Sequence, residues 1–328
     1  MSDAFRHVEF ARTIVFGSGA IAESTDLIGE EYTLLTTRRA ASIVPTVVER
    51  AAWMVEVPSG QVDVVAAQLR AAVVGRRLVA LGGGRVIDVA KALAAADPPR
   101  EVVAIPTSVS GAEMTRVHRH AQGVAQNTPR ARPVVVINDP ALSASQPADA
   151  LAASTSNALG HAMTALFSDR ATPIARSVAR EAIQRLASGW SGTQPERADI
   201  ALGALLAGWA VDHTGLGPHH ALAQSAVRTA ALAHAQTNAA LLPATVRAIR
   251  SRQPTELERL DASLGFSMVA VAERLRELAR AGLGALASDE ELLSRTVEAA
   301  ANRPELDRIP PAPDRAEIRE IYRASAGV

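Results

Sequence analysis

Apolar and polar positions follow different patterns in the two halves of the chain. In the first half, short apolar runs bounded by Gly, Pro, Asp or Arg alternate with Ala-rich stretches of helical spacing. The runs lie at 11–17, 32–37, 77–84, 101–107 and 132–139, and the stretches at about 39–53, 60–75 and 85–97. Strands that alternate with helices, some of them without a polar face, predict a mostly parallel sheet covered on both faces.

The strand pattern disappears after Pro147. From there the spacing of apolar residues predicts only helices, at 148–168, 173–188, 198–213, 219–235, 237–250, 265–282, 288–302 and 314–325. The change falls in the loop 138–150, which contains two prolines. We therefore expect an α/β domain over residues 1–147 and an all-helical domain over residues 148–328.

Composition excludes several classes of function. The chain has 328 residues, 48% of them hydrophobic, and a formal net charge of zero, without the basic excess of a nucleic-acid binder. It has no cysteine, which excludes disulfides, thiolate metal sites and cysteine nucleophiles. The charged N-terminal segment is unlike a signal peptide, and no apolar run is long enough to span a bilayer. We expect a cytoplasmic protein that binds neither nucleic acid nor a membrane.

Three consecutive glycines lie between a predicted buried strand and an amphipathic helix, in LVALGGGRVIDVAKAL (78–93). Glycines let a phosphate approach the backbone closely, and a helix N-terminus offers free N–H groups and a positive dipole. Arg85 adds a cation beside this loop. The motif indicates a pyrophosphate cradle, with a tight strand-to-helix turn as the alternative interpretation.

A second polar loop, SVSGAEMT (108–115), follows the strand predicted at 101–107. Ligands of parallel α/β sheets bind beyond the carboxyl ends of the strands. We therefore expect this loop and the glycine loop to lie side by side.

Polar residues interrupt two apolar helical segments in the second half. Asn157 and His161, in NALGHAM (157–163), lie on one face of a helix, as do His220 and Gln224 in GPHHALAQ (217–224). His234 precedes a further helix. A single helical histidine is more often a packed residue than a ligand, whereas histidines that converge from separate helices indicate a site.

In this order, the motifs resemble the iron-containing alcohol dehydrogenase family, which shares its fold with dehydroquinate synthase and glycerol dehydrogenase. GGGRVIDVAK resembles the family's phosphate loop, IPTSVSGAEMT its second cofactor loop, and the histidine segments its metal-site helices. The resemblance extends over nearly the whole chain. It implies an oxidoreductase with an N-terminal Rossmann-like domain, a C-terminal helical domain, bound NAD(P)H and a homodimeric state.

Within this family the segments are most similar to maleylacetate reductases. Those enzymes typically have Asn at the position of Asn157, where metal-dependent dehydrogenases have an Asp ligand, and they carry a double histidine like His219–His220. They reduce the enoate double bond of maleylacetate with NADH or NADPH and are generally described as not needing a metal. The resemblance therefore implies a metal-independent, NAD(P)H-dependent reductase of an unsaturated or keto acid.

The resemblance also assigns roles to residues. The metal ligands of the metal-dependent relatives map to Asn157, His161, His220 and His234, so a metal, if bound, would be held by the three histidines. Without a metal, His161, His220 and His234 are candidates for proton transfer and for binding negative charge, since imidazoles can protonate near neutral pH. Asn157, His219 and Gln224 are candidate substrate-binding residues. The candidate cofactor-binding residues are Gly82, Gly83, Gly84, Arg85, Asp88, Thr37, Arg38, Thr107, Ser108 and Thr115.

The chain departs from the family pattern at several positions. Arg85 stands where the phosphate loop usually has Ser, and Gln224 stands where a further His is common. Two alternatives follow: a metal-dependent alcohol dehydrogenase with a three-His site, or a family member repurposed as a lyase, cyclase or binding protein. Arg38 and Arg39 follow a strand where an acidic residue would bind the ribose of NAD, so NADPH is allowed as cofactor.

Overall fold

The structure is a computed structural model, and it describes residues 12–327. The N-terminal segment that we interpreted as unlike a signal peptide lies mostly outside the described residues. Two compact units divide the chain between Gln146 and Pro147.

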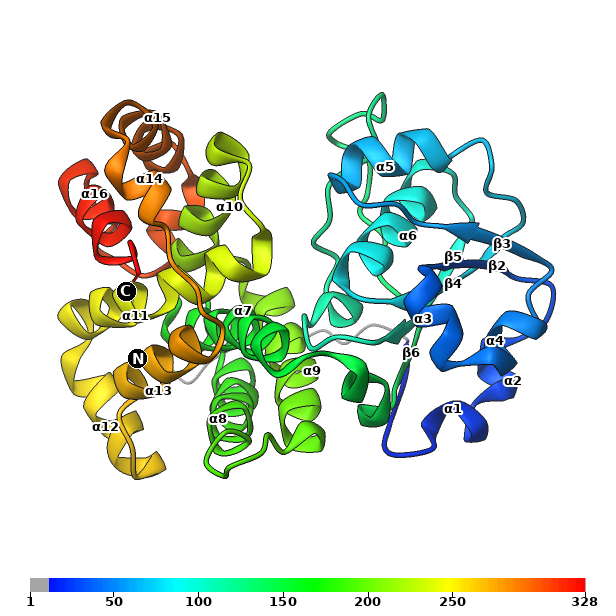
Figure 1. The fold of residues 1–328 in the computed structure, drawn as a ribbon, viewed down its shortest axis with the longest axis horizontal. Coiled ribbons are helices and arrows are strands. Elements are labelled where there is room, and N and C mark those ends of the chain that lie inside the picture. The colour runs from blue at the N-terminus through cyan, green and yellow to red at the C-terminus, as the bar shows by residue number, and fades with distance from the viewer. Residues whose placement is uncertain (1–11, 328) are drawn as a thin grey trace. The chain divides into compact units, whose positions relative to one another are not determined.

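The N-terminal unit is built on a six-stranded sheet in which every strand pair is parallel (Figure 1). The strand order is β1-β6-β5-β4-β2-β3, so β4 and β5 are central. The strands are β1 (Thr13–Phe16), β2 (Thr33–Thr36), β3 (Trp53–Glu56), β4 (Arg77–Gly82), β5 (Glu101–Pro106) and β6 (Val135–Asn138). The register aligns Gly82 at the end of β4 with Pro106 at the end of β5, which brings the two predicted loops to the same edge.

Helices cover both faces of this sheet. One core contains Leu78 and Ala80 of β4, and the other contains Val79 and Leu81, so alternate residues of one strand enter opposite cores. On the first face lie α5 (Val62–Leu69) and α6 (Gly84–Ala96), and on the second α1 (Ala20–Glu23), α2 (Thr25–Ile28), α3 (Arg38–Ile43), α4 (Pro45–Glu49) and the 3₁₀ turn η2 (Pro140–Ser145). The predicted parallel sheet covered on both faces is confirmed.

The helix expected over 39–53 is wrong in detail. Pro45 disfavours a helical conformation at Val44, and the chain forms the two short helices α3 and α4 instead. It then enters β3, an edge strand that the sequence pattern did not predict. Only one of its four residues, Val55, is buried, so β3 lacks the apolar run of a central strand.

The C-terminal unit is all-helical among the described residues, as predicted. Its elements are α7 (Ala148–Phe167), α8 (Pro173–Ser188), α9 (Arg197–Thr214), α10 (Pro218–Ala230), α11 (His234–Arg252), α12 (Pro254–Leu264), α13 (Met268–Leu278), α14 (Gly284–Ser288), α15 (Glu290–Ala301), the 3₁₀ turn η3 (Pro304–Arg308) and α16 (Arg315–Ala324). Helix α12 was not predicted, and the helix expected at 265–282 is the shorter α13. Within residues 12–327, no helix is long and apolar enough to cross a membrane.

Helix α7 is the central helix of this unit (Figure 1). Every residue from Leu151 to Phe167 is buried, and α8, α9, α11 and α13 all pack against it. Its many small residues allow this close packing on all sides. Asn157 and His161 therefore lie in the interior of the unit.

Candidate active site

The glycine loop is a sterically restricted turn between β4 and α6. A Cβ on Gly82 would stand 2.7 Å from Cγ2 of Val86, and a Cβ on Gly84 would stand 2.8 Å from Oγ of Ser110. The second loop lies beside it, since the amide of Thr107 donates to the carbonyl of Gly82 at 2.9 Å. A side chain at either position would therefore force Val86 of α6 or Ser110 of the second loop to move.

The first turn of α6 offers unpaired backbone donors. Gly83 is its N-cap and provides no side-chain cap, and the first bonds back to the Gly83 carbonyl come from Val86 and Ile87. In the described part of the chain, the N–H groups of Gly84 and Arg85 have no acceptor. A helix N-terminus with free N–H groups and no Cβ in the way fits the pyrophosphate of a dinucleotide.

Lys91 of α6 holds the second loop in place, although its residue pattern did not mark it as a site residue. Its ammonium is fully buried and donates to the carbonyls of Ala112, Thr115 and Val117 at 2.9–3.0 Å. It also pairs with Asp88 at 2.7 Å. Asp88 and Thr115, which we expected to bind cofactor, are thus both held by Lys91. The signal was a single cation on the buried face of an apolar helix.

Beyond the carboxyl end of β2, Thr37 and Arg38 lie at the start of α3. The Thr37 hydroxyl accepts from the amide of Ala40 and caps the helix. Arg38 is exposed and donates to Glu56 at 3.1 Å. No acid was expected at this position, because Glu56 ends the unpredicted strand β3. The register of β2 and β3 aligns Glu56 with Thr36 and brings an acid to this edge.

In the helical unit, histidines from two helices meet. The rings of His161 on α7 and His220 on α10 stack with centroids 4.1 Å apart and an angle of 17°. His220 donates from Nε2 to Oδ1 of Asn157 at 3.2 Å. The ring of His219 lies 5.0 Å from that of His220, nearly perpendicular to it. The structure therefore brings together Asn157, His161, His219 and His220; we call these the histidine cluster.

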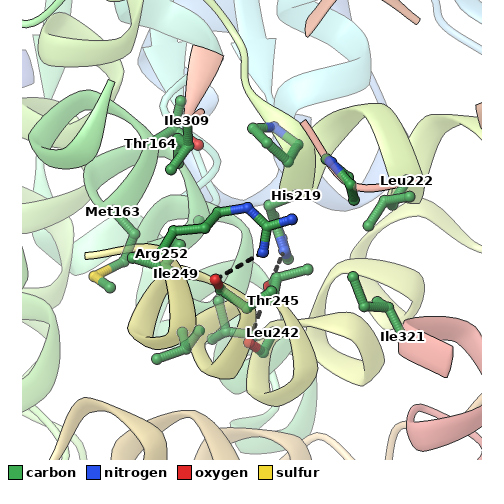
Figure 2. Close-up of a pocket in the computed structure, with 15 residues that line it drawn as sticks. Met163, Thr164, His219, Leu222, Leu242, Thr245, Ile249, Arg252, Ile309 and Ile321 are labelled. Atoms are coloured by element: carbon green, nitrogen blue, oxygen red, sulfur yellow. Dashed lines mark hydrogen bonds between the residues drawn. The ribbon is translucent and has the colours of Figure 1, made fainter. Parts of the chain in front are cut away.

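Helix α11 adds polar residues to this cluster. The Thr245 hydroxyl donates to backbone carbonyls, so His219 donates to it from Nδ1 at 2.9 Å (Figure 2). Asn238 donates to Nε2 of His234 at 3.2 Å. Neither Asn238 nor Thr245 was among the residues expected to form the site. Their spacings of four and seven residues along α11 were the available signal, because such residues share a helix face.

An apolar cavity borders the other side of His219 (Figure 2). Its side chains include Met163, Leu222, Leu242 and Ile249. Arg252 also lines it, but both terminal nitrogens of that arginine donate to Glu317 at 2.6 Å. The positive charge of Arg252 is therefore already balanced by Glu317 and does not face the cavity unpaired.

Burial keeps the two adjacent histidines neutral. Desolvation lowers the pKa of His219 to about 4, partly offset by the neighbouring side-chain amide of Asn238. Desolvation, together with the neighbouring His161, His219 and His234, lowers the pKa of His220 well below its usual range. This differs from the expectation of protonation near neutral pH, because a buried site favours the uncharged ring.

The donor set does not fit a metal ion as arranged. Stacked, nearly parallel imidazoles cannot both direct in-plane lone pairs at one ion. His220 uses Nε2 for Asn157, and His234 uses Nε2 for Asn238. Among residues 12–327, no three His, Asp or Glu side chains are placed to hold a metal.

Gln224 and His213 form contacts with residues outside the histidine cluster. Gln224 accepts at Oε1 from Arg303 at 2.8 Å, and Arg303 also pairs with Glu305. His213, on α9, contacts Trp209 of its own helix through a hydrogen bond and ring contact. Gln224 is therefore directed toward η3.

Comparison with known proteins shows the family. The iron-containing alcohol dehydrogenase family matches residues 11–140, and the Fe-containing alcohol dehydrogenase family, C-terminal, matches residues 151–326. The chain belongs to this family and is an oxidoreductase.

Its relatives include maleylacetate reductases. The chain is 31% identical over 299 residues to the maleylacetate reductase of Sphingobium indicum, covering 83% of this chain and 82% of that protein. It is 31% identical to maleylacetate reductase 1 of Rhodococcus opacus, covering 80% and 76%.

Solved structures of related proteins share this fold over nearly the whole length of the chain. The iron-containing alcohol dehydrogenase of Corynebacterium glutamicum superimposes with a TM-score of 0.84 at 25% identity, covering 99% of this chain and 97% of the other. The maleylacetate reductase of Agrobacterium tumefaciens gives 0.81 at 25% identity, covering 98% of each chain.

Proposed function

We propose that the chain is an NAD(P)H-dependent, metal-independent reductase of an unsaturated or keto acid, as its maleylacetate reductase relatives suggest. The observation that carries this proposal is the pair formed by Asn157 and His220, at 3.2 Å. A neutral amide there gives a metal ion no charge, and it leaves the buried ring of His220 neutral.

The residues that would hold the cofactor are those of the two loops. We propose that the N–H groups of Gly84 and Arg85 bind the pyrophosphate. Lys91 holds the second loop through three of its carbonyls. A bound nicotinamide supplies the hydride. Arg38 and Glu56 offer a cation for a 2′-phosphate and an acid for ribose hydroxyls, so we propose that both NADPH and NADH bind.

The chain's own residues divide the remaining work. The hydrogen bond to Asn157 fixes the orientation of the His220 ring. Because burial keeps this ring neutral, it acts through hydrogen bonds and carries no charge. His234 is exposed, unlike His161 and His220. We assign to His234 the exchange of the proton with solvent, because it is the exposed one of the three candidate histidines.

Oxidation of NADH and NADPH by the purified chain, with maleylacetate and simple 2-oxo acids, tests this function. Turnover that survives chelator treatment, with no bound metal, is the expected result. Stoichiometric zinc or iron that is lost together with activity would establish the metal-dependent dehydrogenase instead. Tight cofactor binding without oxidation by any acid would indicate a repurposed family member.

Asn157→Asp is the matched variant for the metal question. It restores the carboxylate of the metal-dependent relatives, so we expect zinc binding to rise above that of the wild type. Chelator sensitivity that appears in the variant and not in the wild type would support the assignment of Asn157.

The family resemblance also supports a homodimer with a small-molecule acid as its substrate. Light scattering on the purified chain tests the oligomeric state.

A further inference from the structure

The buried ring of His219 is not enclosed by side chains on all sides. A Cβ on Gly160 of α7 would stand 2.7 Å from its Nε2, so this ring edge packs directly against the backbone of α7. The ring also borders the apolar cavity, whose lining includes Leu222, Leu242 and Ile249 (Figure 2). Because a cavity leaves room for a ring to turn, packing alone does not fix the orientation of His219.

The hydroxyl of Thr245 on α11 supplies a polar contact that does. Its oxygen lies 2.9 Å from Nδ1 of His219. A hydroxyl has one hydrogen, and this one is directed at the carbonyls of Leu241 and Leu242, at 3.1 and 2.9 Å. The oxygen therefore accepts from the ring, which places the proton of His219 on Nδ1. Since a neutral imidazole has a single N–H, Nε2 is then bare.

The surroundings of Nε2 agree with this tautomer. Nε2 of His219 is buried and has no hydrogen-bond partner among residues 12–327. An N–H at this atom would be a buried donor without an acceptor, which native proteins rarely contain. In that opposite tautomer the ring would also stop donating to Thr245. Both nitrogens thus favour the proton on Nδ1.

His219 in turn contacts the ring at the centre of the histidine cluster. The rings of His219 and His220 meet with centroids 5.0 Å apart and an angle of 79°, an arrangement that aromatic pairs favour. His220 also stacks on His161 and bonds Asn157. The position of His219 therefore limits the positions that are open to His220.

We propose that Thr245 is a positioning residue of the candidate active site: it fixes the proton of His219 on Nδ1 and, through that ring, the orientation of His220. His219 then has no N–H to offer a substrate, and it supports His220 instead of contacting the acid. This replaces the role of substrate contact that the residue pattern suggested for His219. The inference rests on the proposed function, because it takes the histidine cluster to be the reacting site.

Ring ¹⁵N spectroscopy of histidine-labelled protein measures the tautomer, because protonated and bare ring nitrogens give well-separated signals. The chain has eight histidines, and His219→Asn identifies the signals of His219 by their loss. At neutral pH we expect a protonated Nδ1 in the wild type and in Thr245→Ser, which keeps the hydroxyl. Thr245→Val should move the proton to Nε2 and shift the ring signals of His220. A bare Nδ1 in the wild type, or unchanged ring signals in Thr245→Val, would overturn the proposal.

Turnover of NADPH with maleylacetate measures the consequence for the site. We expect Thr245→Val to lower kcat by about tenfold with the KM for NADPH unchanged, because a small displacement of a reacting group is costly. Thr245→Ser should recover most of that loss. The matched control is Thr237→Val, since Thr237 is a buried threonine of the same helix whose hydroxyl donates to Ala233 at 2.9 Å. An equal loss of kcat in both valine variants would assign the effect to α11 and refute the positioning role.

A double-mutant cycle shows whether Thr245 acts through His219. In a His219→Ala background the ring is absent, so Thr245→Val should cause no further loss of kcat. A full additional loss in that background would contradict the proposal.

The two proposals fail separately, because the tautomer is measured without a substrate. A tautomer that depends on Thr245, in a protein that oxidises NAD(P)H with no acid, would leave the positioning of the rings standing and remove the function. Turnover of an acid, with the same tautomer in Thr245→Val and wild type, would leave the function standing and remove the positioning role.

Discussion

Gly160 allows His219 to pack against helix α7, and Gly160→Ala tests that packing. A Cβ at this position would stand 2.7 Å from Nε2 and 3.1 Å from Cγ of His219. The ring is held from its other side by Thr245 at 2.9 Å. It can move away from a new methyl group only by losing that hydrogen bond.

Opposing terms decide the sign of the effect. Alanine is favoured over glycine inside a helix by about 1 kcal/mol. Forcing a methyl group into a packed core costs about 1–3 kcal/mol, and the lost Thr245 bond costs about 1 kcal/mol more. We therefore expect Gly160→Ala to lower the free energy of unfolding by about 1–3 kcal/mol.

Urea unfolding of a double-mutant cycle measures this. In a His219→Ala background the ring is gone, the methyl group has room, and Gly160→Ala should stabilise by up to about 1 kcal/mol. The sign of the glycine substitution should thus reverse between the two backgrounds. The same effect in both backgrounds would refute the packing argument.

Three further predictions follow from the two units. Gly83→Val should abolish NAD(P)H binding in a fluorescence titration, because its side chain would occupy the path of the pyrophosphate; unchanged affinity would refute the cradle. Lys91→Met leaves Asp88 and three loop carbonyls without their cation and should cost about 3–5 kcal/mol of unfolding free energy in urea, more than Lys91→Arg; a loss below that of Lys91→Arg would contradict this role. Burial lowers the pKa of His219 to about 4 from an ordinary value of 6.5. Between these values the unfolded chain binds the extra proton, so the wild type should lose up to about 3 kcal/mol as pH falls through this range. His219→Asn keeps a donor for Thr245 without the titrating ring and should flatten that loss; parallel pH curves for the two proteins would contradict it.

The regular parts of the fold were predictable because their burial is uniform. Strands β4, β5 and β6 are apolar on both faces, and the apolar run that this requires is visible in the sequence. Strand β3 and helix α12 were missed for the opposite reason. β3 buries one residue, and α12 buries only Leu257 and Leu260, so neither carries a strong periodic signal.

Residue types and local spacing indicated much of the candidate site. The glycine loop, the pair Asn157 and His161, and the double histidine 219–220 are visible in the sequence because each lies within a turn or two of one element. Other contacts connect elements that are distant in the chain. Thr245 of α11 binds His219 of α10, and Lys91 of α6 binds the second loop. No local pattern encodes such contacts.

The sequence by itself determined the two-part architecture, the family and the chemical inventory of the site, because periodicity and short motifs are local properties of a chain. Only the tertiary structure decided the protonation state and the orientation of those residues. Burial among α7, α10 and α11 lowers the pKa of His219 and His220, and packing turns the rings of His161 and His220 face to face. Protonation state and ligand geometry depend on surroundings gathered from the whole helical unit.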